Sequence, residues 1–109
     1  MIYFIYIYKV QQKLYDEQLK VFGEHGIHDN VEQAHLAEMK YLDCCLKESL
    51  RLYPSVPIIT RTVEAKTEID GCILDKGQSI IAFIYYLHRN PAVWDNPNEF
   101  NPERFSEGQ

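Results

Sequence analysis

Apolar residues in the first third of the chain recur at a spacing typical of helices. Residues 9–22 are mainly polar, with apolar positions three to four residues apart, and Gly23 is well suited to end such a helix. After a short loop, Asp29 or Asn30 can cap a second, short helix that runs through Leu36. The pattern therefore predicts two helices before residue 37.

A third, longer helix is predicted from about Ala37 to Tyr53, where Pro54 stops it. At 100° per residue, one face of this helix collects an apolar stripe: Leu42, Cys45, Leu46, Ser49, Leu50 and Tyr53. Glu48 and Arg51 lie well away from that stripe. Acid and base three residues apart are common on helix surfaces, where a pair contributes about 0.2–0.5 kcal/mol. Helical geometry alone therefore favours a solvent-exposed pair, although a second apolar surface beside Glu48 permits burial.

The pattern then changes to short strands and turns. β-branched residues predict an irregular or edge strand over 56–63. Asp70-Gly71 between two short apolar runs indicates a hairpin, because both central residues of a type I′ turn need positive φ. Ser79–Ile84 has the pattern of a buried strand, and the proline-rich remainder predicts a meander with at most a short turn of helix. The predicted fold class is α+β, with helices first and small β units after them.

Composition narrows the class of protein. With 109 residues and 46% hydrophobic content the chain suits one small domain, and the sequence predicts no domain boundary within it. The formal charge of −5, without a long basic run, argues against a nucleic-acid partner. Three cysteines show neither zinc spacing nor a disulfide framework, so Cys44, Cys45 and Cys72 are interpreted as packing residues in a reducing compartment.

Residues 1–8 form an atypical apolar start. They are strongly apolar but far shorter than the roughly 20 residues that cross a bilayer, and they lack the features of a signal peptide. A strand is one interpretation of this run, and a truncated gene is the preferred one. No membrane anchor is predicted in these 109 residues.

One carboxylate and two arginines offer the material for a buried ionic cluster. A guanidinium has five donors in a rigid fork, so Arg51 and Arg104 could both bind Glu48. Around them, an ordered set of motifs runs from about Gln11 to Phe105. Its members are Glu48-x-x-Arg51, Tyr53-Pro54-Ser55-Val56-Pro57, Glu68-Ile69-Asp70-Gly71, Asp75-Lys76-Gly77, Leu87-His88-Arg89-Asn90-Pro91 and Pro102-Glu103-Arg104-Phe105. This order resembles cytochrome P450. Ala37-Glu38-Met39-Lys40-Tyr41-Leu42-Asp43 and Tyr53-Pro54-Ser55-Val56-Pro57 are similar to family four of those haem-thiolate monooxygenases.

The resemblance assigns structural roles rather than catalytic ones. It implies that Glu48 and Arg51 belong to the K helix and that Arg104 completes a structural triad from the meander, on the proximal side of the haem. It also implies that residues 54–61 pass the haem. Candidate walls of the substrate cavity are Val56, Pro57, Ile58 and Ile59, for which a simple core strand is an equally open interpretation.

In the whole enzyme, the resemblance implies haem b, a lipophilic substrate such as a fatty acid, an NADPH-dependent reductase as partner, and the cytosolic face of the endoplasmic reticulum membrane. The family's cysteine loop and oxygen-activating helix are not found in this chain, so no catalytic residue or metal ligand is assigned to it. Residues Phe105–Gly108 do have the form F-x-x-G, with which the family's cysteine loop begins, but we interpret this match as coincidence. We expect these 109 residues to be a partial domain that is inactive by itself.

Two other classes of function remain open at this stage. One is a non-catalytic α+β interaction module. The other is a metal site, since imidazole and carboxylate ligands suit transition metals and four such residues cluster in the sequence: His25, His28, Glu32 and His35. A solvated loop and helix end explains the same four residues.

Overall fold

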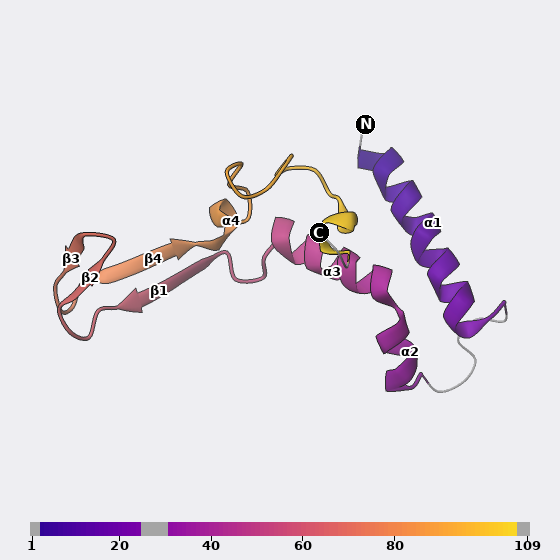
Figure 1. Cartoon of the computed structure of the whole chain (residues 1–109), viewed down its shortest axis with the longest axis horizontal. Helices are drawn as coiled ribbons and strands as arrows, with labels where there is room; N and C mark the ends of the chain where they lie inside the picture. Colours follow the sequence, from indigo (N-terminus) through magenta and orange to yellow (C-terminus); the bar gives the residue numbers. More distant parts are fainter. Residues whose placement is uncertain (1–2, 25–30, 107–109) are drawn as a thin grey trace. The chain divides into compact units, whose positions relative to one another are not determined.

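The computed structural model describes residues 3–24 and 31–106, with side chains from residue 8 onward. It has three helices, then two pairs of antiparallel strands and short helical turns (Figure 1), so the α+β prediction is confirmed. The chain divides into two compact units. The first comprises Met1–Ser49 with Phe100–Gln109, and the second comprises Leu50–Glu99.

Helix α1 (Tyr3–Phe22) is longer than predicted. The strand interpretation of the apolar start is wrong over residues 3–8, which are helical. Neither glycine nor proline separates this run from the helix that follows, so the helix continues through it. Gly23 ends the helix as predicted, because its φ of +76° suits glycine and its N–H donates to the Leu19 carbonyl at 2.9 Å.

Helix α2 (Gln33–Glu38) begins later than predicted, and Glu32 is its N-cap. The predicted caps Asp29 and Asn30 lie outside the described residues. Glu32 and His35 form a capping box, each side chain meeting the other's backbone N–H. Met39, with φ −82° and ψ 64°, separates α2 from the next helix.

Helix α3 (Lys40–Leu52) is shorter than predicted, and of the expected stripe within it only Cys45 is buried. Glu48 is 0% exposed and Arg51 is 2% exposed, whereas Leu46 and Leu50 are each 55% exposed. The solvent-exposed pair that helical geometry alone favoured is therefore wrong, and the structure has the burial that this geometry permitted. Helical geometry describes one helix by itself, whereas the groups that cover these two side chains come from later in the chain.

The strands lie in the second unit and form two ladders (Figure 1). Strand β1 (Ile58–Thr62) pairs with β4 (Ser79–Phe83), with Ile58 opposite Phe83. The predicted hairpin is confirmed as β2 (Thr67–Ile69) and β3 (Cys72–Leu74). Its turn residues Asp70 and Gly71 have φ of +48° and +77°, as a type I′ turn requires.

Burial of the strands differs from the prediction. Strand β4 ends at Phe83, Ile84 opens the short helix α4 (Ile84–Leu87), and Ile81 is 52% exposed. The expected buried strand is therefore mostly exposed among the described residues, since its sheet has only two strands. Cys72 is exposed as well, so its assignment as a packing residue is wrong, while Cys44 and Cys45 are buried as expected.

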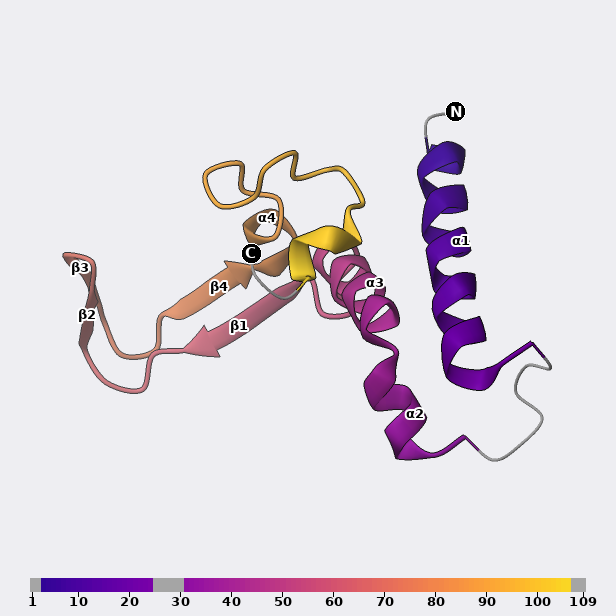
Figure 2. The ribbon, with the colours of Figure 1, turned by 45° about the vertical axis from the view of Figure 1, so that its right-hand side comes forward.

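The tail of the chain ends in a 3₁₀ turn, η1 (Pro102–Phe105), that lies beside α3 in both views (Figures 1 and 2). Asn101 is its N-cap and Pro102 is its first residue, a combination that favours helical starts. Within residues 3–24 and 31–106, none of the helices combines the length and the apolar character needed to span a membrane.

Candidate functional site

Glu48 is the centre of a buried polar cluster in the first unit. Its Oε1 atom accepts the backbone N–H of Asn101 at 2.8 Å and lies 3.4 Å from Nε of Arg104. The Arg104 side chain is only 12% exposed. A buried carboxylate needs such partners, because an unpaired charge removed from water is strongly unfavourable.

The 3₁₀ turn η1 explains how one short segment supplies both donors. The Asn101 side chain accepts the N–H of Glu103 at 3.2 Å, and the Arg104 N–H donates to the Asn101 carbonyl at 3.3 Å. These bonds leave the N–H of Asn101 directed at Glu48 and place the Arg104 side chain beside it. Two residues three positions apart thus reach a carboxylate more than 50 residues earlier in the chain.

Arg51 is the centre of a second cluster, within the second unit. Its Nη1 donates to the carbonyls of His88 at 2.7 Å and Pro97 at 2.8 Å, and its Nη2 donates to the carbonyl of Glu99 at 3.1 Å. The guanidinium carbon lies 5.0 Å from the centre of the Trp94 ring, within range of a cation–π contact. One side chain therefore fixes the path of an irregular segment.

His88 and Arg51 contact each other twice. Besides the bond from the guanidinium to the His88 carbonyl, the His88 ring Nδ1 lies 3.1 Å from the backbone carbonyl of Arg51. A carbonyl can only accept, so this contact calls for a hydrogen on Nδ1. The His88 ring thereby satisfies the Arg51 carbonyl, which is one of those that the end of α3 leaves without a helical partner.

The structure thus brings together Glu48 and Arg104 of the predicted triad, and it places Arg51 against backbone carbonyls. The role of the three residues as a triad stays a prediction. Sequence reasoning missed Asn101 and His88. The signal for Asn101 was available, because Asn directly before Pro is a recognisable N-cap pair. His88 offered no comparable signal, since its contact depends on tertiary packing.

The four candidate cavity residues lie at the start of the β region. Val56 and Pro57 precede β1 and are exposed, Ile58 is exposed opposite Phe83, and Ile59 is half-buried opposite Ala82. The Pro57 carbonyl accepts the N–H of Tyr85 at 3.2 Å. Their role as a substrate wall stays a prediction.

Comparison with known proteins decides the family. A sequence profile of the family described as Cytochrome P450 matches residues 1–109. The chain belongs to the cytochrome P450 family. Cytochrome P450 4c3 of Drosophila melanogaster is 40% identical over 95 residues, which cover 87% of this chain and 18% of that protein. Human cytochrome P450 4V2 is 42% identical over 97 residues, covering 89% and 18% respectively.

A third relative, probable cytochrome P450 4d20 of Drosophila melanogaster, is 41% identical over 101 residues, covering 93% of this chain and 20% of that protein. The chain therefore spans about a fifth of the length of the P450 relatives it matches. Family membership is consistent with the motif order that first indicated it.

The cysteines of this P450 chain do not fit an iron-thiolate site. A thiolate ligand requires a deprotonated cysteine. Burial, together with the smaller effects of the neighbouring Cys44, Glu17 and Glu103, raises the pKa of the Cys45 thiol to about 11, while Lys13 acts in the opposite direction. Cys44 is buried and Cys72 is exposed in a hairpin strand. We therefore assign none of the three to iron.

Tyr41 shares this apolar and acidic surrounding. Burial raises the pKa of its phenol to about 12, and nearby Cys45, Glu103, Cys44 and Glu17 act in the same direction. Its ring also lies 5.3 Å from Nζ of Lys13. Tyr41 therefore stays protonated at neutral pH.

The alternative metal site is only partly within the described residues. His25 and His28 lie outside them. Glu32 and His35 are engaged in the capping box of α2, and the His35 ring packs edge-on against Phe22 at 5.3 Å. Within the part of the chain that the structure describes, no three potential ligands gather into a metal-binding group.

Proposed function

We propose that this chain is a structural segment of a haem-dependent cytochrome P450 monooxygenase, and that Glu48, Arg51 and Arg104 act as its structural triad. The observation that carries the proposal is the complete burial of Glu48, with Asn101 and Arg104 as partners. A charged side chain is retained in such a place when it has partners that a hydrophobic residue could not hold. The triad would fix the tail segment to α3 in the folded enzyme.

The reaction proposed for the whole enzyme is hydroxylation of apolar substrates such as fatty acids. Haem b held by a cysteine thiolate supplies the oxygen chemistry, because the thiolate favours cleavage of the O–O bond. We assign the electrons to an NADPH-dependent reductase and the location to the cytosolic face of the endoplasmic reticulum membrane. No residue of this chain is proposed to bind iron or to touch the reacting atoms.

Val56, Pro57, Ile58 and Ile59 are proposed as part of the wall of the substrate cavity. Exposed apolar side chains at the first three of these positions support the proposal, since burial against substrate removes such surface from water. Polar substitution of Val56 or Ile58 is expected to raise KM for a long-chain substrate without removing haem.

A chimeric enzyme tests the structural role. Residues 11–105 would replace the matching segment of full-length human cytochrome P450 4V2, and haem binding would be followed by the carbon monoxide difference spectrum of the reduced protein. We expect the chimera to show a thiolate-type spectrum and the Glu48→Ala version to lose most of it, because the variant leaves buried donors without an acceptor.

The matched control is Glu68→Ala, which removes an exposed carboxylate from β2. Equal haem content in the Glu48→Ala and unaltered chimeras would overturn the structural role. Separately, the 109-residue chain should show no thiolate-type spectrum and no turnover when supplied with haem and reductase. Activity of the chain alone would contradict the proposal that it is only a structural segment.

A further inference from the structure

We propose that Glu17 of α1 maintains the break between α2 and α3, and that without its carboxylate residues 33–52 form one continuous helix. This inference concerns the conformation of the first unit and does not depend on the proposed enzymatic role. It rests on the geometry around Met39, on the sequence of the segment and on the hydrogen bonds of Glu17.

The sequence of the segment does not itself call for a break. Residues 33–52 contain neither glycine nor proline, and most of them are good helix formers. A continuous helix from about residue 37 is what the pattern of apolar positions predicts. Met39 nevertheless adopts φ −82° and ψ 64°, outside helical values, and closes α2 with its own N–H bonded to the Leu36 carbonyl at 3.3 Å.

The break leaves backbone donors at the start of α3 without helical partners. The Asp43 N–H bonds to the Met39 carbonyl at 3.2 Å, so the N–H groups of residues 40–42 precede the helical ladder. Met39 occupies the cap position, and its thioether is too weak an acceptor to cap them. These N–H groups are therefore open to an acceptor from another part of the chain.

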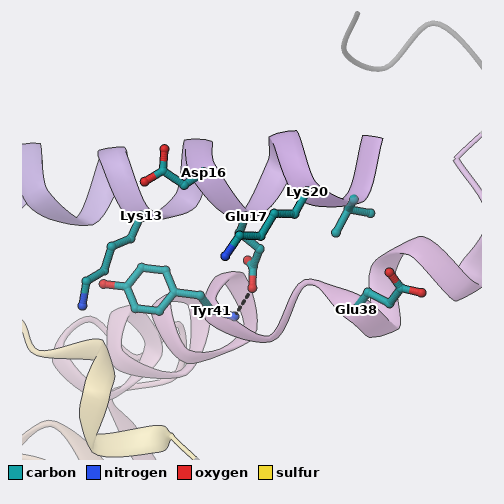
Figure 3. Close-up of a pocket in the computed structure, with 7 residues that line it drawn as sticks. Lys13, Asp16, Glu17, Lys20, Glu38 and Tyr41 are labelled. Carbon is teal, nitrogen blue, oxygen red and sulfur yellow. Dashed lines mark hydrogen bonds between the residues drawn. The ribbon is translucent and has the colours of Figure 1, made fainter. Parts of the chain in front are cut away.

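Glu17 supplies it from α1 (Figure 3). Its Oε1 accepts the N–H of Tyr41 at 2.6 Å, and its Oε2 accepts the N–H of Leu42 at 2.9 Å. Both carboxylate oxygens are used, and a negative charge at the start of a helix is favoured by the helix dipole. Glu17 thus acts as an N-cap that comes from a different helix.

The same two N–H groups would have other acceptors in a continuous helix. There, Tyr41 would bond to the Ala37 carbonyl and Leu42 to the Glu38 carbonyl, four residues back. Glu17 and the backbone therefore compete for the same donors. Removing the carboxylate leaves the continuous helix as the arrangement that satisfies both N–H groups.

Two hollows of the first unit have walls on both sides of Met39. One of about 430 Å³ includes Glu17, Glu38 and Tyr41 in its lining (Figure 3), and one of about 650 Å³ includes Leu36 and Cys44. Straightening the segment would move the α2 side of each wall relative to the α3 side. Glu17 therefore sets the shape of this surface as well as the start of α3.

The test uses the full chain, labelled for nuclear magnetic resonance, with Glu17→Ala. We expect the ¹³Cα shift of Met39 to move from a non-helical to a helical value. Asp16→Ala is the matched control, because it removes the neighbouring carboxylate of α1, which accepts a hydrogen bond from Gln12 of the same helix. It should leave the Met39 shift unchanged.

The proposal is overturned if Met39 keeps its non-helical shift in Glu17→Ala while the Tyr41 and Leu42 amides exchange faster with solvent. If Glu17→Ala does not fold, the conservative variant Glu17→Gln decides the question. Its amide has one acceptor oxygen in place of two, so we expect a Met39 shift part-way to the helical value. A Met39 shift identical to that of the unaltered chain would contradict the proposal.

Discussion

The Glu48 cluster buries a charged side chain, whereas the β1–β4 ladder leaves hydrophobic side chains exposed. Glu48 is fully buried, whereas Ile81 of β4 is 52% exposed. The carboxylate has Asn101 and Arg104 as partners, while the two-stranded sheet leaves its apolar side chains uncovered among the described residues. Burial in this chain therefore follows the availability of tertiary partners more closely than it follows side-chain polarity.

The comparison also separates two kinds of stabilisation. In the first unit, a few directed contacts to one carboxylate join segments that are distant in sequence. In the β ladder, the contacts are a regular register of backbone pairs, from Ile58 with Phe83 to Thr62 with Ser79. We expect stability to be sensitive to single side chains at the cluster and insensitive to them along the exposed ladder.

The largest effect is expected for Glu48→Ala. It removes the acceptor of the Asn101 N–H and leaves the Arg104 guanidinium without its carboxylate, so the free energy of unfolding should fall by about 3–5 kcal/mol. Urea unfolding followed by far-ultraviolet circular dichroism measures it. Glu68→Ala, at an exposed site, should change it by about 0.5 kcal/mol or less. Equal losses in the free energy of unfolding for Glu48→Ala and Glu68→Ala would contradict the special role of the buried cluster.

A smaller loss is expected for Arg51→Lys. Lysine keeps the charge but lacks the planar fork that reaches the His88, Pro97 and Glu99 carbonyls together, so the loss should be about 2 kcal/mol. Trp94 fluorescence can follow the unfolding transition. Arg61→Lys is the matched control, because Arg61 is exposed and donates to the adjacent Thr60 carbonyl. Equal stability of the Arg51→Lys and Arg61→Lys proteins would show that the fork is dispensable.

Local signals in the sequence were sufficient for some features of the fold. The Asp70-Gly71 turn and the end of α1 at Gly23 depend on positive φ, which the residue type itself favours. The buried face of α3 could not be predicted in this way, because residues 101–104 decide it and lie some 50 positions away. Exposure of β4 was missed for the same reason, since an apolar run does not reveal what covers it.

The candidate site, too, could be predicted only in part, because some of its contacts depend on distant residues. Motif order indicated the family and singled out Glu48 and Arg104, which the structure brings within 3.4 Å. It did not indicate the carbonyls that bind Arg51 or the Glu17 carboxylate at the start of α3. An indirect signal for Glu17 existed, because α3 begins without a Ser, Thr, Asp or Asn of its own at the cap.

The pH dependence of stability should reflect the burial of Cys45 on α3. Because the pKa of Cys45 is raised from 9.0 to about 11, its thiol stays protonated in the folded chain after it ionises in the unfolded chain. The free energy of unfolding should therefore be constant with respect to this group below pH 9 and fall as pH rises from 9 to 11. Cys45→Ala should reduce that fall.

Unfolding in urea at several pH values measures this dependence. Replacement of the exposed β3 residue Cys72 by Ala is the control, because it removes a thiol that is not buried. An identical slope for Cys45→Ala and Cys72→Ala would contradict the assigned burial of the Cys45 thiol.

The smallest effect is expected for Ile81→Thr. The side chain is half exposed and threonine keeps β-branching, so the free energy of unfolding should change by about 0.5 kcal/mol or less. The same urea experiment measures it. A loss comparable to that of Glu48→Ala would show that the exposed ladder contributes as much as the buried cluster and would end the contrast between the regions.

A double-mutant cycle of Glu48→Gln and Arg104→Gln tests the central claim most directly. The four proteins would be compared by their free energies of unfolding in urea. Because Arg104 Nε lies 3.4 Å from the fully buried Glu48 carboxylate, we expect a favourable coupling energy of about 1–3 kcal/mol. Additive effects, with a coupling energy near zero, would contradict the account that this contact joins the tail of the chain to α3.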